Sequence, residues 1–116
     1  MNDVITMVKT AAKALDEKKA QNIKIIKIDD VTSLAEYFII CTGTSNTQIK
    51  SLADFAEVSL KEIGEEPLHN EGYISGSWVL LDYGALIIHV FNNQTRDFYA
   101  LEKLWQNGTE IDIDTL

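Results

Sequence analysis

The sequence of 116 residues contains one cysteine, Cys41, and one proline, Pro67. With one cysteine an internal disulfide is impossible, and a lone thiol in an apolar run is typical of a reducing compartment. Because no stretch rich in Pro, Gly or Ser interrupts the chain, we expect one domain over residues 1–116. A domain of this size has enough apolar material for one core and needs neither a disulfide nor a structural metal.

Long apolar runs are also missing. Runs such as Trp78 to Leu81 and Ala85 to Ile88 are far shorter than the roughly 18 residues of a membrane-spanning helix. The N-terminus places Asp3 early and has no long uncharged stretch before a cleavage site, which argues against secretion. These absences predict a soluble protein of the cytoplasm that has no membrane partner.

Basic residues are few, since 10 Lys and Arg against 18 Asp and Glu give a formal net charge of -8. Such a charge repels phosphate backbones and anionic lipids, so direct sequence-specific binding to nucleic acid is disfavoured. The same charge speeds the encounter with a basic partner, and ribosomal proteins are an obvious class. Composition alone is equally consistent with acidity that only keeps the protein soluble.

Apolar periodicity predicts three helices. The first runs from Asn2, its cap, to about Lys19, and the third covers residues 95–107. The second opens with a capping box of Ser45 and Gln48 and ends at Gly64.

Together with these helices, the predicted strands indicate an α/β fold with a mixed sheet. Strands are predicted over residues 23–28 and 37–42, the second of them central, and over a short-period segment after Pro67. WVLLD and ALIIHVF, separated by Tyr83-Gly84, predict an antiparallel hairpin. The predicted order is αββαβββα, about five strands with three helices. We expect the acidic tail, residues 109–116, to be frayed.

Candidate catalytic groups do not converge. Gly43-Thr44-Ser45 is a strand-to-helix turn that could hold a phosphate, as in nucleotidyltransferases. That chemistry needs two carboxylates to hold Mg²⁺, whereas Asp82 stands alone and the only D-x-D lies in the tail. His69 and His89 have no His or Cys at metal-ligand spacing, so we interpret both as structural. We therefore predict no enzyme, cofactor or metal, and keep a nucleotide-binding or nucleotidyltransferase-type enzyme at this turn as the alternative.

The hairpin is the stronger functional candidate. Period-two alternation puts Trp78, Leu80 and Asp82 on one face of its first strand, with Tyr83 on the other. An unpaired interior charge is costly, so the face that carries Asp82 is not deeply buried and its apolar residues are expected to be partly exposed. Tryptophan beside carboxylates suits an interface with a basic partner. The alternative is that Trp78 belongs to the core.

Three segments resemble the Iojap-like family of ribosomal silencing factors (RsfS). They are DDVTSLAEYFIICTGTSNTQIKSLAD, EGYISGSWVLLDYGALIIHVF and RDFYALEKLW, and the similarity runs from the first helix to Trp105. One departure is Ala85, where the family usually has an acid. The resemblance implies a nucleotidyltransferase-like fold without transferase activity.

The resemblance also implies a function. Such proteins repress translation by binding ribosomal protein L-fourteen on the large ribosomal subunit and blocking association with the small subunit. Carried onto this chain, the expected partner-binding residues are Glu71, Trp78, Leu80, Asp82 and Tyr83. A third hypothesis is that the exposed hairpin forms a homodimer in isolation.

Overall fold

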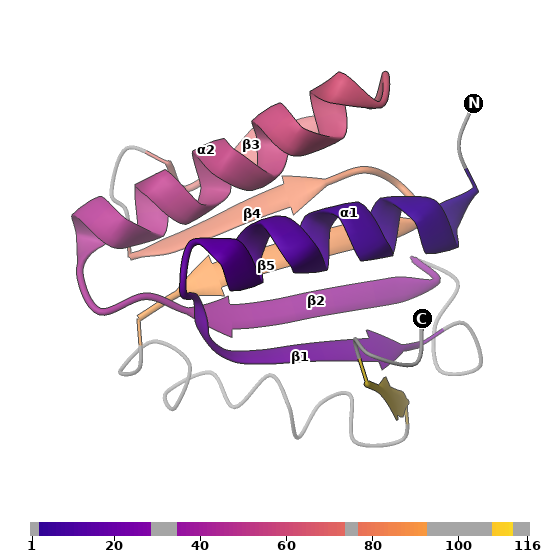
Figure 1. Ribbon diagram of the computed structural model, residues 1–116, viewed down its shortest axis with the longest axis horizontal. Helices are drawn as coiled ribbons and strands as arrows, with labels where there is room; N and C mark the ends of the chain where they lie inside the picture. Colours follow the sequence, from indigo (N-terminus) through magenta and orange to yellow (C-terminus); the bar gives the residue numbers. More distant parts are fainter. Residues whose placement is uncertain (1–2, 29–34, 74–76, 93–107, 113–116) are drawn as a thin grey trace.

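The computed structural model describes residues 3–28, 35–73, 77–92 and 108–112 (Figure 1). The predicted third helix, over residues 95–107, lies outside the described residues.

The described residues form a six-stranded mixed sheet with two helices, which confirms the predicted α/β class. The helices are α1 (Val4–Glu17) and α2 (Asn46–Glu62), and the strands are β1 (Gln21–Lys27), β2 (Tyr37–Thr42), β3 (His69–Glu71), β4 (Trp78–Asp82), β5 (Leu86–Phe91) and β6 (Thr109–Ile111). The strand order is β3-β4-β5-β2-β1-β6. β2 and β5 pair in parallel, and the other described pairs are antiparallel. Both helices lie on the same face of the sheet (Figure 1).

Helix α1 begins one residue later than predicted. Its cap is Asp3, not Asn2: the Asp3 carboxylate accepts a hydrogen bond from the backbone N–H of Thr6 at 2.8 Å. This hydrogen bond lowers the pKa of Asp3, because it favours the ionised carboxylate. Neither described helix is long and apolar enough to cross a membrane.

Helix α2 begins and ends as predicted. Ser45 caps its start by accepting from the N–H of Gln48 at 3.1 Å, and Gln48 Oε1 in turn accepts from the N–H and the hydroxyl of Thr44. At the other end Gly64 has a φ of +89°, a conformation that favours glycine. The interaction of Gln48 with Thr44 instead of with Ser45 is a shifted form of the capping box.

The sheet separates two apolar clusters. On the helix side, apolar residues of both helices, such as Leu15 and Leu52, pack against apolar residues of the sheet, such as Leu81 and Ile88. On the opposite side a smaller cluster contains Phe38, Ile40 and Phe91, with Trp78 and Ile87 packed against it. β2 is buried at every position, which confirms its predicted central place. The side opposite the helices is the one that carries the candidate site.

The predicted frayed tail is in part a strand. β6 pairs antiparallel with β1, with Ile111 opposite Ile25 and Glu110 opposite Ile26. The Glu110 carboxylate also forms an ion pair with Lys24 at 2.8 Å. A strand of three mostly polar residues has too little apolar pattern to be recognised in the sequence, since it depends on the edge of β1 for its hydrogen bonds.

Candidate interaction surface on strand β4

Strand β4 alternates in burial as its sequence predicts. Trp78, Leu80 and Asp82 are half-buried, whereas Val79 and Leu81 are fully buried on the helix side. The first three side chains therefore share the face opposite α1 and α2. The structure confirms that Trp78 and Leu80 are partly exposed.

Strand β3 extends this face toward the edge of the sheet. Glu71 is opposite Leu80 and His69 is opposite Asp82, so both side chains project on the same face as their partners. All three residues of β3 are exposed. We name Glu71, Trp78, Leu80 and Asp82 together the Trp78 surface. His69 borders it, a position that the sequence did not reveal because the pairing register of β3 was unknown.

Tyr83 does not join this surface. Its side chain is 8% exposed and packs in the cluster under the helices, on the other face of the sheet. Burial and the charges of Glu57 and Glu65 raise the pKa of Tyr83, so its hydroxyl stays protonated. Because side chains alternate along β4 and into the turn, Tyr83 supports the packing of α2 and is not placed to contact a partner together with Trp78.

Asp82 also has a structural role. Its Oδ1 accepts a hydrogen bond from the N–H of Gly84 at 2.7 Å, and Gly84 has a φ of +83°. The carboxylate therefore closes the β4–β5 turn while one edge stays accessible, since the residue is half-buried. The hydrogen bond to Gly84 is a sufficient reason for an aspartate at this position, whether or not a partner protein contacts it.

Trp78 is held in place by strand β5. Its indole N–H donates to Nδ1 of His89 at 3.2 Å. Its ring stacks on Phe91, with 5.7 Å between ring centres and an angle of 26° between the planes. Phe38 packs edge-on against the other side of His89, with 4.9 Å between ring centres. These contacts leave the tryptophan ring ordered before any partner binds, which lowers the entropy lost on association.

His89 is neutral because of this arrangement. The residue is 5% exposed, and burial lowers its pKa from 6.5 to about 4. Because Nδ1 accepts from Trp78, the proton of the neutral ring lies on Nε2, which is buried without a hydrogen-bond partner in the described part of the chain. His89 is thus a structural support for Trp78, and its predicted structural role is consistent with these contacts.

We expect the buried His89 to make folding sensitive to mild acid. Between pH 6.5 and about 4 the unfolded chain binds a proton at this residue and the folded chain does not, so falling pH favours unfolding. From pH 7.5 to 5 this one group should remove about 2 kcal/mol from the free energy of unfolding. Urea unfolding at a series of pH values measures the loss.

The control for this prediction is a pair of variants. His89→Phe keeps an aromatic ring among Phe38, Trp78 and Phe91 but cannot titrate, so its free energy of unfolding should fall less with pH. His69→Gln, on exposed β3, should retain the full loss seen in the wild type. An equal pH dependence for His89→Phe and the wild type would contradict the assignment.

In the turn of Gly43, Thr44 and Ser45, backbone N–H groups that could bind a phosphate form hydrogen bonds within the fold. The N–H of Gly43 donates to the carbonyl of Phe91 at 3.1 Å, and the N–H of Thr44 donates to Gln48 Oε1. These two N–H groups already have acceptors within the protein and are not available to bind a phosphate. Among the described residues no three His, Cys, Asp or Glu side chains are grouped to hold a metal ion. The geometry gives the alternative of a nucleotide site no support.

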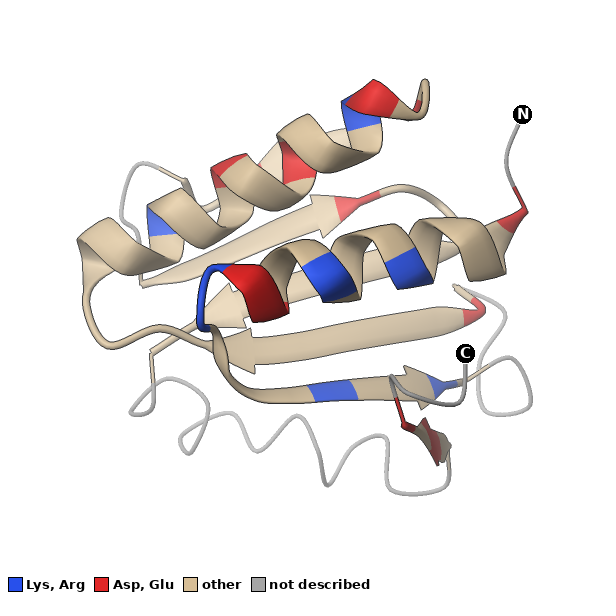
Figure 2. Ribbon diagram, in the orientation of Figure 1, with Lys and Arg blue, Asp and Glu red and all other residues tan. Residues whose placement is uncertain are grey.

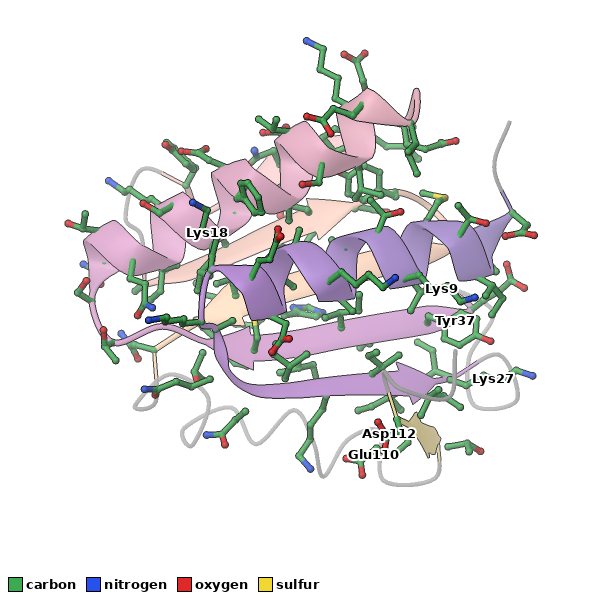
Figure 3. All side chains as sticks on the ribbon, in the orientation of Figure 1. Lys9, Lys18, Lys27, Tyr37, Glu110 and Asp112 are labelled. Carbon is green, nitrogen blue, oxygen red and sulfur yellow. The ribbon has the colours of Figure 1, made fainter. Side chains whose placement is uncertain are left out.

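Acidic and basic residues are concentrated in different elements of the fold. Residues 46–82 hold seven Asp and Glu and two Lys, whereas residues 3–28 hold six Lys and three Asp and Glu. Figure 2 shows the acidic positions over α2 and the end of β4, and the lysines along α1 and β1. Lys18 lies 4.7 Å from the centre of the Phe55 ring, and Lys24 forms an ion pair with Glu110. Figure 3 labels Lys18, next to the end of α1, and Glu110, on β6. The acidic range, residues 46–82, includes the Trp78 surface.

Neither of two hollows in the described structure belongs to the Trp78 surface. One, of about 580 Å³, lies beside β1 and β6, and the other, of about 540 Å³, lies between α2 and β3. No residue of the Trp78 surface lines either of them. A surface without a deep pocket suits a protein partner better than a small molecule, which is usually enclosed.

The chain is similar to proteins of one family over most of its length. The family model described as "Ribosomal silencing factor during starvation" matches residues 1–116. The chain is 35% identical to ribosomal silencing factor RsfS of Bacillus subtilis, over 94% of this chain and 92% of the relative. It is 41% identical to the RsfS of Chromobacterium violaceum, over 84% and 80% of the two chains. A crystal structure of protein CV0518 from Chromobacterium violaceum has a TM-score of 0.88 at 37% identity, covering 96% of this chain and 92% of that one. The chain therefore belongs to the ribosomal silencing factors, a family of ribosome-associated regulators of translation that are not enzymes.

Proposed function

We propose that this protein represses translation by binding ribosomal protein L-fourteen on the large ribosomal subunit, which blocks association with the small subunit. The contact is made by the Trp78 surface, Glu71, Trp78, Leu80 and Asp82. Tyr83 acts indirectly, through the packing of α2. The target is the ribosome of the cytoplasm.

The observation that carries the proposal is the ordered, half-buried Trp78. Tryptophan is enriched among the residues that dominate binding energy, because it brings a large contact area at a small entropic cost. Here the ring is held by His89 and Phe91, and Leu80 lies two residues along the same face. An apolar centre with a polar, accessible rim is the usual composition of a protein interface.

The charge of the rim specifies the kind of partner. Glu71 is exposed and Asp82 is half-buried at the border of the apolar centre. Residues 46–82, which include both of them, carry seven Asp and Glu against two Lys. Ribosomal proteins that contact RNA carry an excess of Lys and Arg, so opposite charges meet across the interface. The charge increases the rate of encounter, while the tryptophan supplies most of the affinity.

The proposed repression is steric: the space that the bound protein occupies is enough to prevent the subunits from joining. The chain measures 32 × 31 × 26 Å along its principal axes. A rigid body of this size on the subunit-joining face occupies space that the small subunit needs, so joining waits for its release. No chemical step is required, which agrees with the non-enzymatic character of the family.

The proposal is tested by mixing the protein with purified large subunits before small subunits are added, under conditions that favour joined ribosomes. Sucrose-gradient sedimentation should show the protein with free large subunits and a reduced peak of joined ribosomes. Calorimetry with isolated ribosomal protein L-fourteen should show direct binding. A protein that remains on large subunits without reducing joining would contradict the blocking step, and no heat with ribosomal protein L-fourteen would contradict the choice of partner.

A further inference from the structure

A second candidate surface lies on the helix side of the sheet, at the edge opposite β6. The second half of α2 and residues 65–70 border the open groove of about 540 Å³. It is separate from the Trp78 surface, which lies on the other face of the sheet.

The groove contains the most exposed aliphatic side chains of the described structure. Leu68 is 68% exposed and Val58 is 52% exposed, and both line the groove beside Pro67. Leu68 comes from the chain that enters β3, and Val58 from α2. Single exposed apolar residues need no explanation, but a group of them in one hollow with a polar rim is typical of a binding site.

Strand β3 offers backbone hydrogen bonds beside this groove. It is the last strand in the sheet order and pairs on one side with β4, so its outer backbone groups face away from the described sheet. Such an edge can accept an added strand from a partner, whose alternate side chains then enter the adjacent hollow. His69 and Asn70 belong to both the strand and the groove.

The rim of the groove is acidic. Glu57, Glu65 and Glu66 line it, against one lysine, Lys61, which already lies 3.9 Å from the Glu66 carboxylate. The negative charges of Glu57 and Glu65 also help to raise the pKa of the Tyr83 hydroxyl, so their field reaches into the fold. A second copy of this chain, with a net charge of -8, would bring acid against acid.

We propose that this groove binds an extended basic segment of a partner protein. The segment adds to β3 as a strand, places aliphatic side chains against Val58 and Leu68, and directs Lys or Arg toward Glu57, Glu65 and Glu66. This site goes beyond the proposed contact with ribosomal protein L-fourteen, because its apolar and acidic side chains line the groove between α2 and β3 and do not belong to the Trp78 surface.

The test uses the full chain and a short amidated peptide in which Lys and Arg alternate with Val and Leu. In ¹H–¹⁵N NMR titration the peptide should cause saturable shifts at Val58 and Leu68 and along His69 to Glu71. Leu68→Gln should weaken binding about tenfold, because an apolar contact is lost at a position too exposed to affect folding. Lys61→Glu should strengthen binding about twofold to fivefold.

The controls decide between the possible occupants. A peptide with Glu at every Lys and Arg should cause no saturable shift, and Trp78→Ala should bind the basic peptide as the wild type does. Absence of saturable shifts, equal binding of the acidic peptide, or unchanged affinity for Leu68→Gln would overturn the proposal. Shifts of the same residues on raising the protein concentration alone would overturn it in favour of self-association. None of these results depends on ribosomes, so they leave the proposed function to its own test.

Discussion

Replacing Trp78 with alanine is expected to weaken binding to the large ribosomal subunit at least about 30-fold, corresponding to about 2 kcal/mol. The substitution removes the largest side chain of the Trp78 surface, which is already ordered by its stacking on Phe91. It also leaves Nδ1 of the buried His89 without its donor, at a cost to the folded state of about 1–3 kcal/mol. Cosedimentation with large subunits measures the affinity, and thermal unfolding shows whether the variant is folded at the temperature used.

Two variants separate the loss of contact from the loss of stability. Trp78→Phe keeps a ring against Phe91 but removes the indole N–H, so it should bind more tightly than Trp78→Ala. Phe55→Ala removes a half-buried aromatic ring from α2, on the opposite face of the sheet, and should leave binding unchanged. Wild-type affinity for a folded Trp78→Ala, or an equal loss for Phe55→Ala, would show that this surface does not dominate the contact.

Replacing Gly72 with alanine is expected to lower the free energy of unfolding by about 3 kcal/mol or more. Gly72 follows β3 with a φ of +80°, where a side chain is disfavoured. A Cβ at this position would also lie 1.9 Å from the carbonyl oxygen of Trp78, so the backbone of β3 or β4 must move. Because Glu71 and Trp78 flank the clash, the variant should weaken large-subunit binding as well. Urea unfolding measures the first effect and cosedimentation the second.

Gly64 provides a matched control for Gly72. Its φ of +89° is almost the same, but no atom lies within 4 Å of the position that a Cβ would take. Gly64→Ala should therefore cost only the backbone term, about 1–2 kcal/mol, and leave binding unchanged. If the two alanine variants are equally stable, the close approach of Gly72 to Trp78 is not what requires glycine there.

Much of the fold was predictable because local signals agreed with the tertiary structure. The continuous apolar segment from Tyr37 predicted a central buried strand, and β2 is buried throughout. Ser45 with Gln48, and Gly64, correctly predicted the ends of α2. The cap of α1 was placed at Asn2 instead of Asp3 because adjacent Asn and Asp are equally good caps. β6 was missed because its pairing with β1 joins residues distant in sequence.

The candidate site was predictable only along one strand. Alternation put Trp78, Leu80 and Asp82 together, and the structure agrees. It also separated Tyr83 from them, and the expectation that Tyr83 shares their contact surface came from the family resemblance, not from the alternation. The support of Trp78 by His89 could not be predicted, because it depends on the register of β5 and on the orientation of two rings.

The sequence by itself determined the class of fold, the family and the alternation of β4, since helical and strand periods, caps and turn residues act over a few neighbouring positions. Only the tertiary structure decided that Glu71 lies opposite Leu80, that His89 holds Trp78, and that Val58 and Leu68 meet in an acidic groove. The physical reason is that strand register and the packing of α2 on the sheet are set by contacts between distant segments. No local pattern specifies which of these side chains become neighbours.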